Sequence, residues 1–168
     1  MAAEVLILAV FALLALAAAW DIASFTIPNF IPLSLIVLFA CFVVAARLSW
    51  DAIGSHVLVG FIGLIAGFVL FALRFIGGGD AKLFAATLVW LGLRDALDYT
   101  LIAALFGGGL TLAILSVRAL PLPVFLVRHA WIARLHDQKA GIPYGVALAS
   151  GAFAVLPYTE VFRVAAAL

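Results

Sequence analysis

The chain carries very little charge, and this scarcity excludes most soluble classes of protein. Of its 168 residues, 68% are hydrophobic and only 10% are charged, with a formal net charge of +1 at pH 7. A soluble core does not need so much apolar sequence, and a nucleic-acid-binding protein needs a basic surface that this chain lacks. The composition therefore predicts a protein embedded in a lipid bilayer, with no nucleic-acid partner.

Cysteine and strand-like alternation are also scarce. Cys41 is the only cysteine, which excludes an intrachain disulfide and a cysteine-based zinc site, and we expect it to pack within an apolar segment. His56, His129 and His136 do not form a convincing metal-binding pattern, so we expect no metal and no cofactor. Because lipid offers no partner for backbone N–H and C=O groups, the apolar segments are expected to be helices.

Six segments approach the length of about 20 apolar residues that a membrane-spanning helix needs. They cover roughly residues 3–20, 29–48, 53–73, 81–97, 99–118 and 142–163. We therefore predict an all-α polytopic membrane protein, a bundle of six transmembrane helices forming a single domain over residues 1–168. The first segment has the apolar character of a signal peptide, but Glu4 stands where basic residues are expected, which favours a retained helix.

The charges and aromatic residues between these segments predict an orientation. With the N-terminus outside, six Lys and Arg residues lie on the inner side and three on the outer side, as the positive-inside rule expects. Aromatic rings that prefer the headgroup layer also stand near segment ends: Trp20, Trp50, Trp90, Trp131, Tyr99 and Tyr158.

Two aspartates interrupt the apolar sequence on the same predicted side, Asp21 in WDIASFTIPN and Asp80 in IGGGDAKL. A charged residue in a membrane segment costs about 2.5 to 3.5 kcal/mol on insertion scales, which favours a functional role. Two neighbouring carboxyls can share one proton and activate water. The structural alternatives are that Asp80 is a helix N-cap and that Asp21 ends the first helix at headgroup level, with Pro28 starting the next helix.

The spacing of charges in the fourth segment predicts that one of its ends lies below the membrane surface. Lys82 and Arg94 are 12 residues apart, which is about 18 Å of helix against a hydrocarbon core of about 30 Å. We therefore expect the GGGD turn to be recessed into a protein-lined cavity that water can reach. Gly77, Gly78 and Gly79 would let another segment approach closely there.

Two further patterns predict packing surfaces: the glycines of the third and fifth segments, and an amphipathic stretch at residues 124–139. Gly60, Gly63 and Gly67, like residues 107–109, allow close helix approach, either within the bundle or at the face of a homodimer. Both alternatives stay open. Residues 124–139 carry apolar side chains at helical spacing and predict an amphipathic helix at the membrane interface.

At the two aspartates the sequence resembles the type IV prepilin peptidases, membrane aspartic proteases with a G-x-G-D motif, and most closely the small form associated with tight-adherence (Flp-type) pili. The first motif is matched by Asp21, Ile27, Pro28 and Asn29. The second, G-x-G-D-x-K-L, is matched by Gly77, Gly79, Asp80, Lys82 and Leu83. The segment IPYGVALASG at residues 142–151 is similar to the family's last helix, and by resemblance Pro143 and Tyr144 line the site, although helix-start geometry and an aromatic belt explain them equally well.

The resemblance implies an aspartic endopeptidase of the bacterial inner membrane. Such an enzyme removes the cytoplasmic leader of prepilins and pseudopilins just before their hydrophobic N-terminal helix. Asp21 and Asp80 would be the catalytic pair, one activating water while the other polarises the scissile carbonyl. Supporting or substrate-binding roles would belong to Gly77, Gly79, Lys82, Pro28 and Asn29. Because the chain lacks the cytoplasmic insertion with paired cysteines of larger members, the resemblance does not imply N-methylation of pilin.

Two alternatives complete the sequence-based picture. A proton- or cation-coupled transporter or channel subunit would also place aspartates in the membrane, but it does not explain why both gather near one face, and no inverted repeats mark a central site. Two roles of Lys82 are equally supported by the sequence. Its ammonium group contacts the acids or a substrate carboxylate, or it anchors the helix start by snorkelling to the membrane surface.

Overall fold

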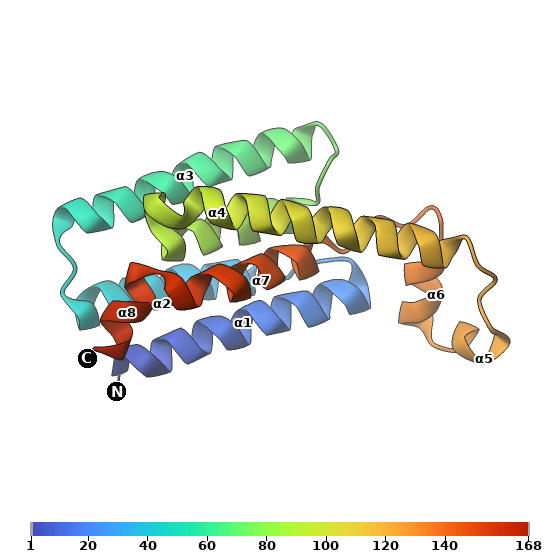
Figure 1. Cartoon of the computed structure of the whole chain (residues 1–168), viewed down its shortest axis with the longest axis horizontal. Helices are drawn as coiled ribbons and strands as arrows, with labels where there is room; N and C mark the ends of the chain where they lie inside the picture. The colour runs from blue at the N-terminus through green and yellow to red at the C-terminus, as the bar shows by residue number, and fades with distance from the viewer. Residues whose placement is uncertain (1, 168) are drawn as a thin grey trace.

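The computed structural model describes residues 2–167, and every regular element among them is helical (Figure 1). The longer helices are α1 (Ala2–Ser24), α2 (Phe30–Ala46), α3 (Trp50–Ala72), α4 (Gly78–Arg118) and α7 (Tyr144–Val155). The shorter ones are α5 (Val124–Val127), α6 (Ala130–His136), the 3-10 helix η1 (Leu156–Tyr158) and α8 (Glu160–Ala166). The predicted all-α class is confirmed.

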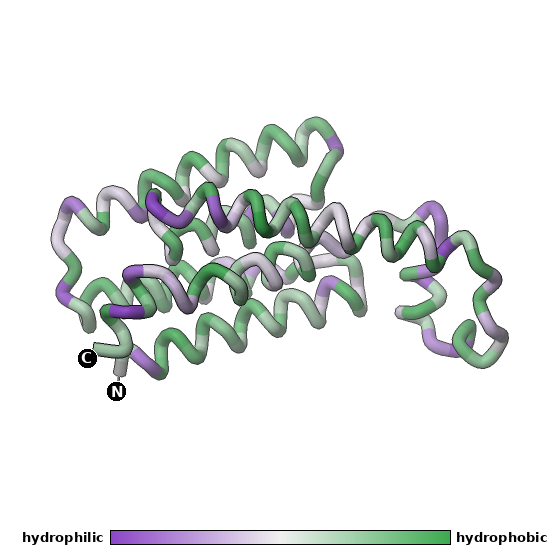
Figure 2. The backbone as a smooth tube through the Cα atoms, in the orientation of Figure 1, coloured by the Kyte–Doolittle hydropathy of each residue, from purple (hydrophilic) through white to green (hydrophobic). Residues whose placement is uncertain are grey.

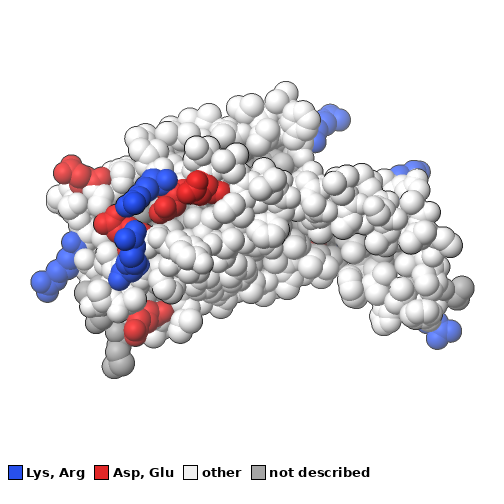
Figure 3. Space-filling model, in the orientation of Figure 1, with Lys and Arg blue, Asp and Glu red and all other residues white. Residues whose placement is uncertain are grey.

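Three helices within residues 2–167 are long and apolar enough to cross a bilayer, over Ala3–Ser24, Trp50–Ala72 and Gly78–Arg118. A bent pair, Tyr144–Tyr158 with Glu160–Ala166, makes a fourth candidate, and α2 is apolar but has only 17 residues. On the visible face, charged side chains gather toward the two ends of the bundle and leave an apolar, uncharged belt between them (Figures 2 and 3). The chain is therefore a polytopic membrane protein with three to four candidate spans.

The helix α4 is a hairpin and not a single rod. Gly92 has φ 74° and ψ 179°, a backbone conformation that glycine tolerates and other residues rarely adopt. The chain reverses there, so that a first arm, residues 78–91, and a second arm, residues 93–118, run back along each other (Figure 1). The ring of Phe84 on the first arm stacks on Tyr99 of the second, with centroids 5.6 Å apart. The predicted boundary between the segments 81–97 and 99–118 was wrong. The break lies at Gly92, and the polar run LRDALD, residues 93–98, begins the second arm.

His56 of α3 holds this reversal in place. Its ring Nδ1 lies 2.8 Å from the carbonyl oxygen of Val89, in the last turn of the first arm. Carbonyls at the end of a helix lack partners within the helix, so a ring N–H can satisfy this one. A Cβ on Gly92 would lie only 2.8 Å from Cε1 of the same ring. No pattern in the sequence indicates this role of His56.

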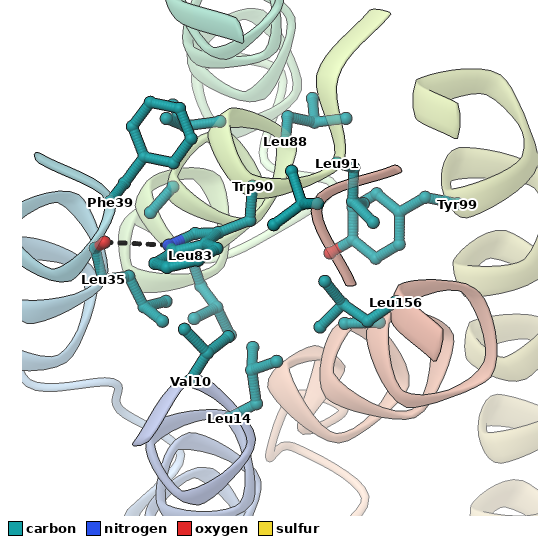
Figure 4. Close-up of a cluster of buried hydrophobic side chains, with 14 of the residues drawn as sticks. Val10, Leu14, Leu35, Phe39, Leu83, Leu88, Trp90, Leu91, Tyr99 and Leu156 are labelled. Atoms are coloured by element: carbon teal, nitrogen blue, oxygen red, sulfur yellow. Dashed lines mark hydrogen bonds between the residues drawn. The ribbon is translucent and has the colours of Figure 1, made fainter. Parts of the chain in front are cut away.

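Trp90 and Tyr99 lie at the centre of the hydrophobic core (Figure 4). Both are fully buried, and Nε1 of Trp90 donates a hydrogen bond of 2.9 Å to the carbonyl of Leu35. Phe39 and Phe42 pack on the indole, each with a ring centroid 5.5 Å away. The predicted headgroup position of Trp90 and Tyr99 is therefore wrong, because the reversal turns both rings inward; the other tryptophans are exposed.

The glycines of α3 face the first arm of α4. Gly60, Gly63 and Gly67 are all buried. A Cβ on Gly67 would lie 3.0 Å from the Cα of Ala81, and a Cβ on Gly60 or Gly63 would collide with a side chain of the first arm. Close packing within the bundle, one of the two alternatives, thus explains these glycines.

The segment after α4 is not one amphipathic helix, contrary to expectation. His129 has extended backbone, with φ −93° and ψ 105°, and separates α5 from α6. The segment is instead tied to α4 by Arg118, a buried residue with 7% of its surface exposed. It donates to the carbonyls of Leu135 at 2.8 Å, Ala140 at 3.1 Å and Gly141 at 2.9 Å.

Two further expectations are corrected. The last predicted segment, residues 142–163, bends by 57° between Tyr144–Tyr158 and Glu160–Ala166. Thr159 starts a new helix there, because its hydroxyl accepts the N–H of Phe162 at 3.2 Å as an N-cap. Cys41 is exposed on α2 and does not pack inside the bundle.

Candidate active site

Asp21 lies in the last turn of α1 and is 4% exposed. Its Oδ2 accepts a hydrogen bond of 2.7 Å from the backbone N–H of Gly145, in the first turn of α7. The first N–H groups of a helix have no partner within that helix, so the carboxyl satisfies one of them. This bond fixes the end of α1 against the start of α7.

Asp80 is the third residue of α4 and is 7% exposed. Its Oδ2 accepts a hydrogen bond of 2.9 Å from the backbone N–H of Gly77, which is the N-cap. Asp80 is not the N-cap of α4, which was the structural alternative for this residue, because the helix begins at Gly78. The side chain instead reaches back to the N-cap residue, as the acidic partner of a capping box does.

The two carboxyl groups lie close enough to interact electrostatically. Ile27, from the loop after Asp21, packs between the start of α4, which carries Asp80, and the start of α7, whose Gly145 binds Asp21. A Cβ on Gly79 would lie 3.0 Å from the Cβ of Ile27, and a Cβ on Gly145 would lie 2.7 Å from its Cδ1. The close approach predicted at the glycine run is confirmed at Gly79, and the acids meet at one end of the bundle.

Lys82 connects the two motifs by a side-chain hydrogen bond. Its Nζ donates to Oδ1 of Asn29 at 2.8 Å. Asn29 directly precedes α2, and its side chain does not cap that helix. Pro28 does not start α2, as the structural alternative for Asp21 required, since the helix begins at Phe30. Lys82 and Asn29 thus join the loop after Asp21 to the helix that carries Asp80.

A cavity of about 340 Å³ opens beside Asp80. Its wall is apolar apart from this carboxyl, Thr100 and the phenol of Tyr144, and it includes residues Ile76, Phe84, Gly107 and Leu148. The cavity lies between the two arms of α4 and α7, at the end of the bundle where the acids meet. Tyr144 lines this cavity, which adjoins the GGGD turn through Ile76 and Asp80. The recessed position of the turn below the membrane surface stays a prediction.

The arrangement leaves one oxygen of each acid available for chemistry. Oδ2 of each carboxyl is held by a backbone N–H, while Oδ1 of each makes no hydrogen bond within the described part of the chain. Two such carboxyls can divide the work of a base and an acid on one water molecule. Among residues 2–167, no three His, Cys, Asp or Glu side chains lie together as a metal site would require.

Gly145 is the site residue that the sequence did not single out. It stands inside the segment IPYGVALASG, which marked Pro143 and Tyr144 as candidates. A backbone N–H donor carries no side-chain signature, so only the fold shows that this glycine meets Asp21.

The sequence also matches a known protein family. Residues 8–112 match the type IV leader peptidase family, peptidase A24, a region that spans more than half of the chain and includes both aspartates. Comparisons with curated proteins and with solved structures gave no match. The chain therefore belongs to the type IV leader peptidase family of membrane-embedded aspartic prepilin peptidases.

Proposed function

We propose that this protein removes the leader peptide of Flp-type prepilins and pseudopilins, with Asp21 and Asp80 as its catalytic pair. The observation that carries the proposal is the meeting of two buried carboxyls, from two separate motifs, at one end of the bundle. The family assignment favours this peptidase over the transporter alternative. The resemblance of both motifs to the small, tight-adherence form supports the choice of substrate.

The proposed reaction is hydrolysis of one peptide bond by an activated water. The ionised carboxylate accepts a proton from water as it attacks the scissile carbonyl, and the protonated carboxyl donates a hydrogen bond to the carbonyl oxygen. The tetrahedral intermediate then collapses, and the leaving amine takes up the proton that the first acid accepted. The hydrogen bonds from Gly145 and Gly77 hold the two carboxyls in place for both steps.

The cavity beside Asp80 is suited to the apolar side of the cleavage site. A prepilin has a polar leader followed directly by a hydrophobic helix, so the residues after the scissile bond are apolar. Phe84, Tyr144 and Leu148 can surround such residues, while Asp80 faces the bond. Gly107 leaves room in the wall, because a Cβ there would lie 3.3 Å from the ring of Tyr144.

We further propose that the single domain, residues 1–168, crosses the inner membrane six times. The passes are α1, α2, α3, the two arms of α4, and α7 with α8. By their positions along the chain, six of the nine Lys and Arg residues belong to the end of the bundle that holds the acids, which favours a cytoplasmic location for that end. A cytoplasmic site is where a leader that has not crossed the membrane can be cut.

The other residues of the two motifs hold the acids and the loop after Asp21 in place. Gly77 supplies the N–H that holds Asp80, and Gly79 gives Ile27 room to pack between the helix starts. Pro28 stiffens the loop after Asp21, and the contact between Asn29 and Lys82 fixes that loop to α4.

Co-expression with Flp-type prepilins, with leader removal scored by mass spectrometry of the pilin N-terminus, tests the proposal. We expect Asp21→Asn and Asp80→Asn each to reduce cleavage at least about a hundredfold, the contribution typical of acid–base groups. The matched control is Asp98→Asn, which changes an exposed acid on the second arm of α4 and should cleave normally. Full activity in either active-site variant, or ion flux that both substitutions abolish, would refute the catalytic pair.

A further inference from the structure

A second cavity lies on the opposite face of the first arm of α4. At 100° per residue, Asp80 and Phe84 face the active-site cavity, while Lys82 and Ala85 face the other way. There, α2 and α3 each pack on α4 but leave an apolar groove of about 560 Å³ between them. Its lining includes Ile36, Phe61, Leu64, Gly60 and Ala86. Neither acid lines this groove, so it is distinct from the candidate active site.

The groove is polar at one end only. Its polar lining residues are Asn29, which precedes α2, and Lys82, in the first turns of α4. Both lie at the end of the bundle that holds the two acids. Lys82 is exposed and donates to Asn29 at 2.8 Å, and within residues 2–167 it has no carboxylate partner. An ammonium group and an amide N–H₂ group are therefore available to an anion at the mouth of the groove.

We propose that this groove binds one anionic phospholipid, with the phosphate on Lys82 and Asn29 and an acyl chain along the apolar floor. A single cation at the membrane face, above a hydrophobic channel, is complementary to an amphiphile with one negative headgroup. A phosphate held by both side chains would also reinforce the connection between the Asp21 loop and α4.

The size of the groove favours a lipid chain over the helix of a protein. A spanning helix about 10 Å wide and 30 Å long fills roughly 2,400 Å³, several times the volume of the groove. Pockets of about 300 to 1,000 Å³ commonly bury most of the surface of a drug-sized ligand. The occupant is therefore a lipid and not the hydrophobic helix of a pilin.

Native mass spectrometry of the purified full chain tests the headgroup contact. Phosphatidylglycerol and phosphatidylcholine with identical acyl chains are titrated in detergent, and retention of the first bound lipid is compared. We expect roughly fivefold tighter retention of phosphatidylglycerol, the effect of one lysine near an anionic headgroup. Lys82→Met should remove this preference and Lys82→Arg should keep it. Lys139→Met, which changes the chain's other lysine outside the groove, should also keep it.

A second pair of variants tests the acyl-chain contact. Ile36→Trp places a larger side chain in the groove and should weaken retention of both lipids, whereas Val37→Trp, on an exposed neighbouring position outside the groove, should not. Thermal melting confirms that each variant is folded before it is compared. Equal retention of the two lipids, or a preference that survives Lys82→Met, would overturn the proposal. Displacement of the bound lipid by a pilin-helix peptide would assign the groove to the substrate instead.

Discussion

The backbone N–H of Gly145 donates a hydrogen bond of 2.7 Å to Oδ2 of Asp21, and there is no room for a side chain at this position. A Cβ there would lie 2.8 Å from the same oxygen and 2.7 Å from Cδ1 of Ile27. This hydrogen bond brings the IPYG motif, the last one in the sequence, into direct contact with Asp21. The position of Asp21 thus depends on a helix that begins more than a hundred residues later in the chain.

Gly145→Ala should therefore reduce leader cleavage by about a hundredfold, since a shift of about 1 Å in a catalytic group can cost that much. Cleavage of a co-expressed prepilin, measured by mass spectrometry, checks this expectation. Gly141→Ala is the matched control, because no atom lies within 4 Å of a Cβ at that position. Unchanged cleavage in Gly145→Ala would show that the bond to Asp21 does not position the acid.

The pH dependence of cleavage should be bell-shaped. At low pH both carboxyls are protonated and no base remains, and at high pH both are ionised and no acid remains. Because Asp21 and Asp80 interact, the two limbs belong to the pair and not to either residue. Initial rates with purified enzyme and a prepilin in detergent provide the profile. A rate that rises to a plateau without a second limb would argue against a shared proton.

Gly92→Ala should destabilise the bundle, because its φ of 74° is strained for alanine and the new Cβ would meet the ring of His56. Such strain costs about 1 to 3 kcal/mol, which lowers the melting temperature of a chain this long by roughly 5 °C. Differential scanning fluorimetry in detergent can measure the shift. Gly109→Ala, at an open helical position of the second arm, should melt like the unaltered protein. Equal melting of both variants would mean that the reversal does not need glycine.

Arg118→Met should loosen the segment that follows α4. The substitution leaves the carbonyls of Leu135, Ala140 and Gly141 without their donor, so hydrogen exchange and protease cleavage in residues 128–141 should increase. Arg128→Met removes an exposed cation from the same segment and serves as the control. If both variants exchange at the same rate, Arg118 does not hold this segment.

Cysteine labelling in intact cells tests the orientation. In a background with Cys41 replaced, Thr26→Cys and Lys139→Cys should react only after the inner membrane is permeabilised, whereas Trp50→Cys and Asp98→Cys should react from the outside. Each of these positions is exposed. Labelling of residues 26 and 139 from opposite sides would place the loop after Asp21 and the segment before α7 on different faces of the membrane, and would contradict the cytoplasmic site.

The sequence predicts the helical class, the membrane-embedded character and the position of both acids at one end of the bundle, for physical reasons. The catalytic role of the acids stays a prediction. A chain with so few charged residues folds in a lipid bilayer and not in water. An aspartate within its apolar segments is therefore easy to recognise as a candidate functional residue. The reversal at Gly92 could not be predicted, because LRDALD looks like a polar loop while the residue that breaks the helix is a glycine in an apolar run. Trp90 was misplaced for the same reason, since its depth follows from where the helix turns.

Contacts made by the backbone were also beyond the reach of the sequence. The N–H of Gly145 and the carbonyls that Arg118 binds have no residue-type signature. Lys82 is a different case, because its charge was noticed but its partner, Asn29, could be identified only from the packing of α2 on α4.

Because α4 is a hairpin, the number of residues in its first arm sets the position of Asp80 in the site. His56 and Gly92 lock one end of the arm, and Asp80 stands twelve residues away at the other. Inserting or deleting one residue between them would rotate the carboxyl by about 100° and move it about 1.5 Å along the axis, away from its partner. Evolution can therefore exchange side chains along this arm, but a change in the number of its residues would put the two acids out of register.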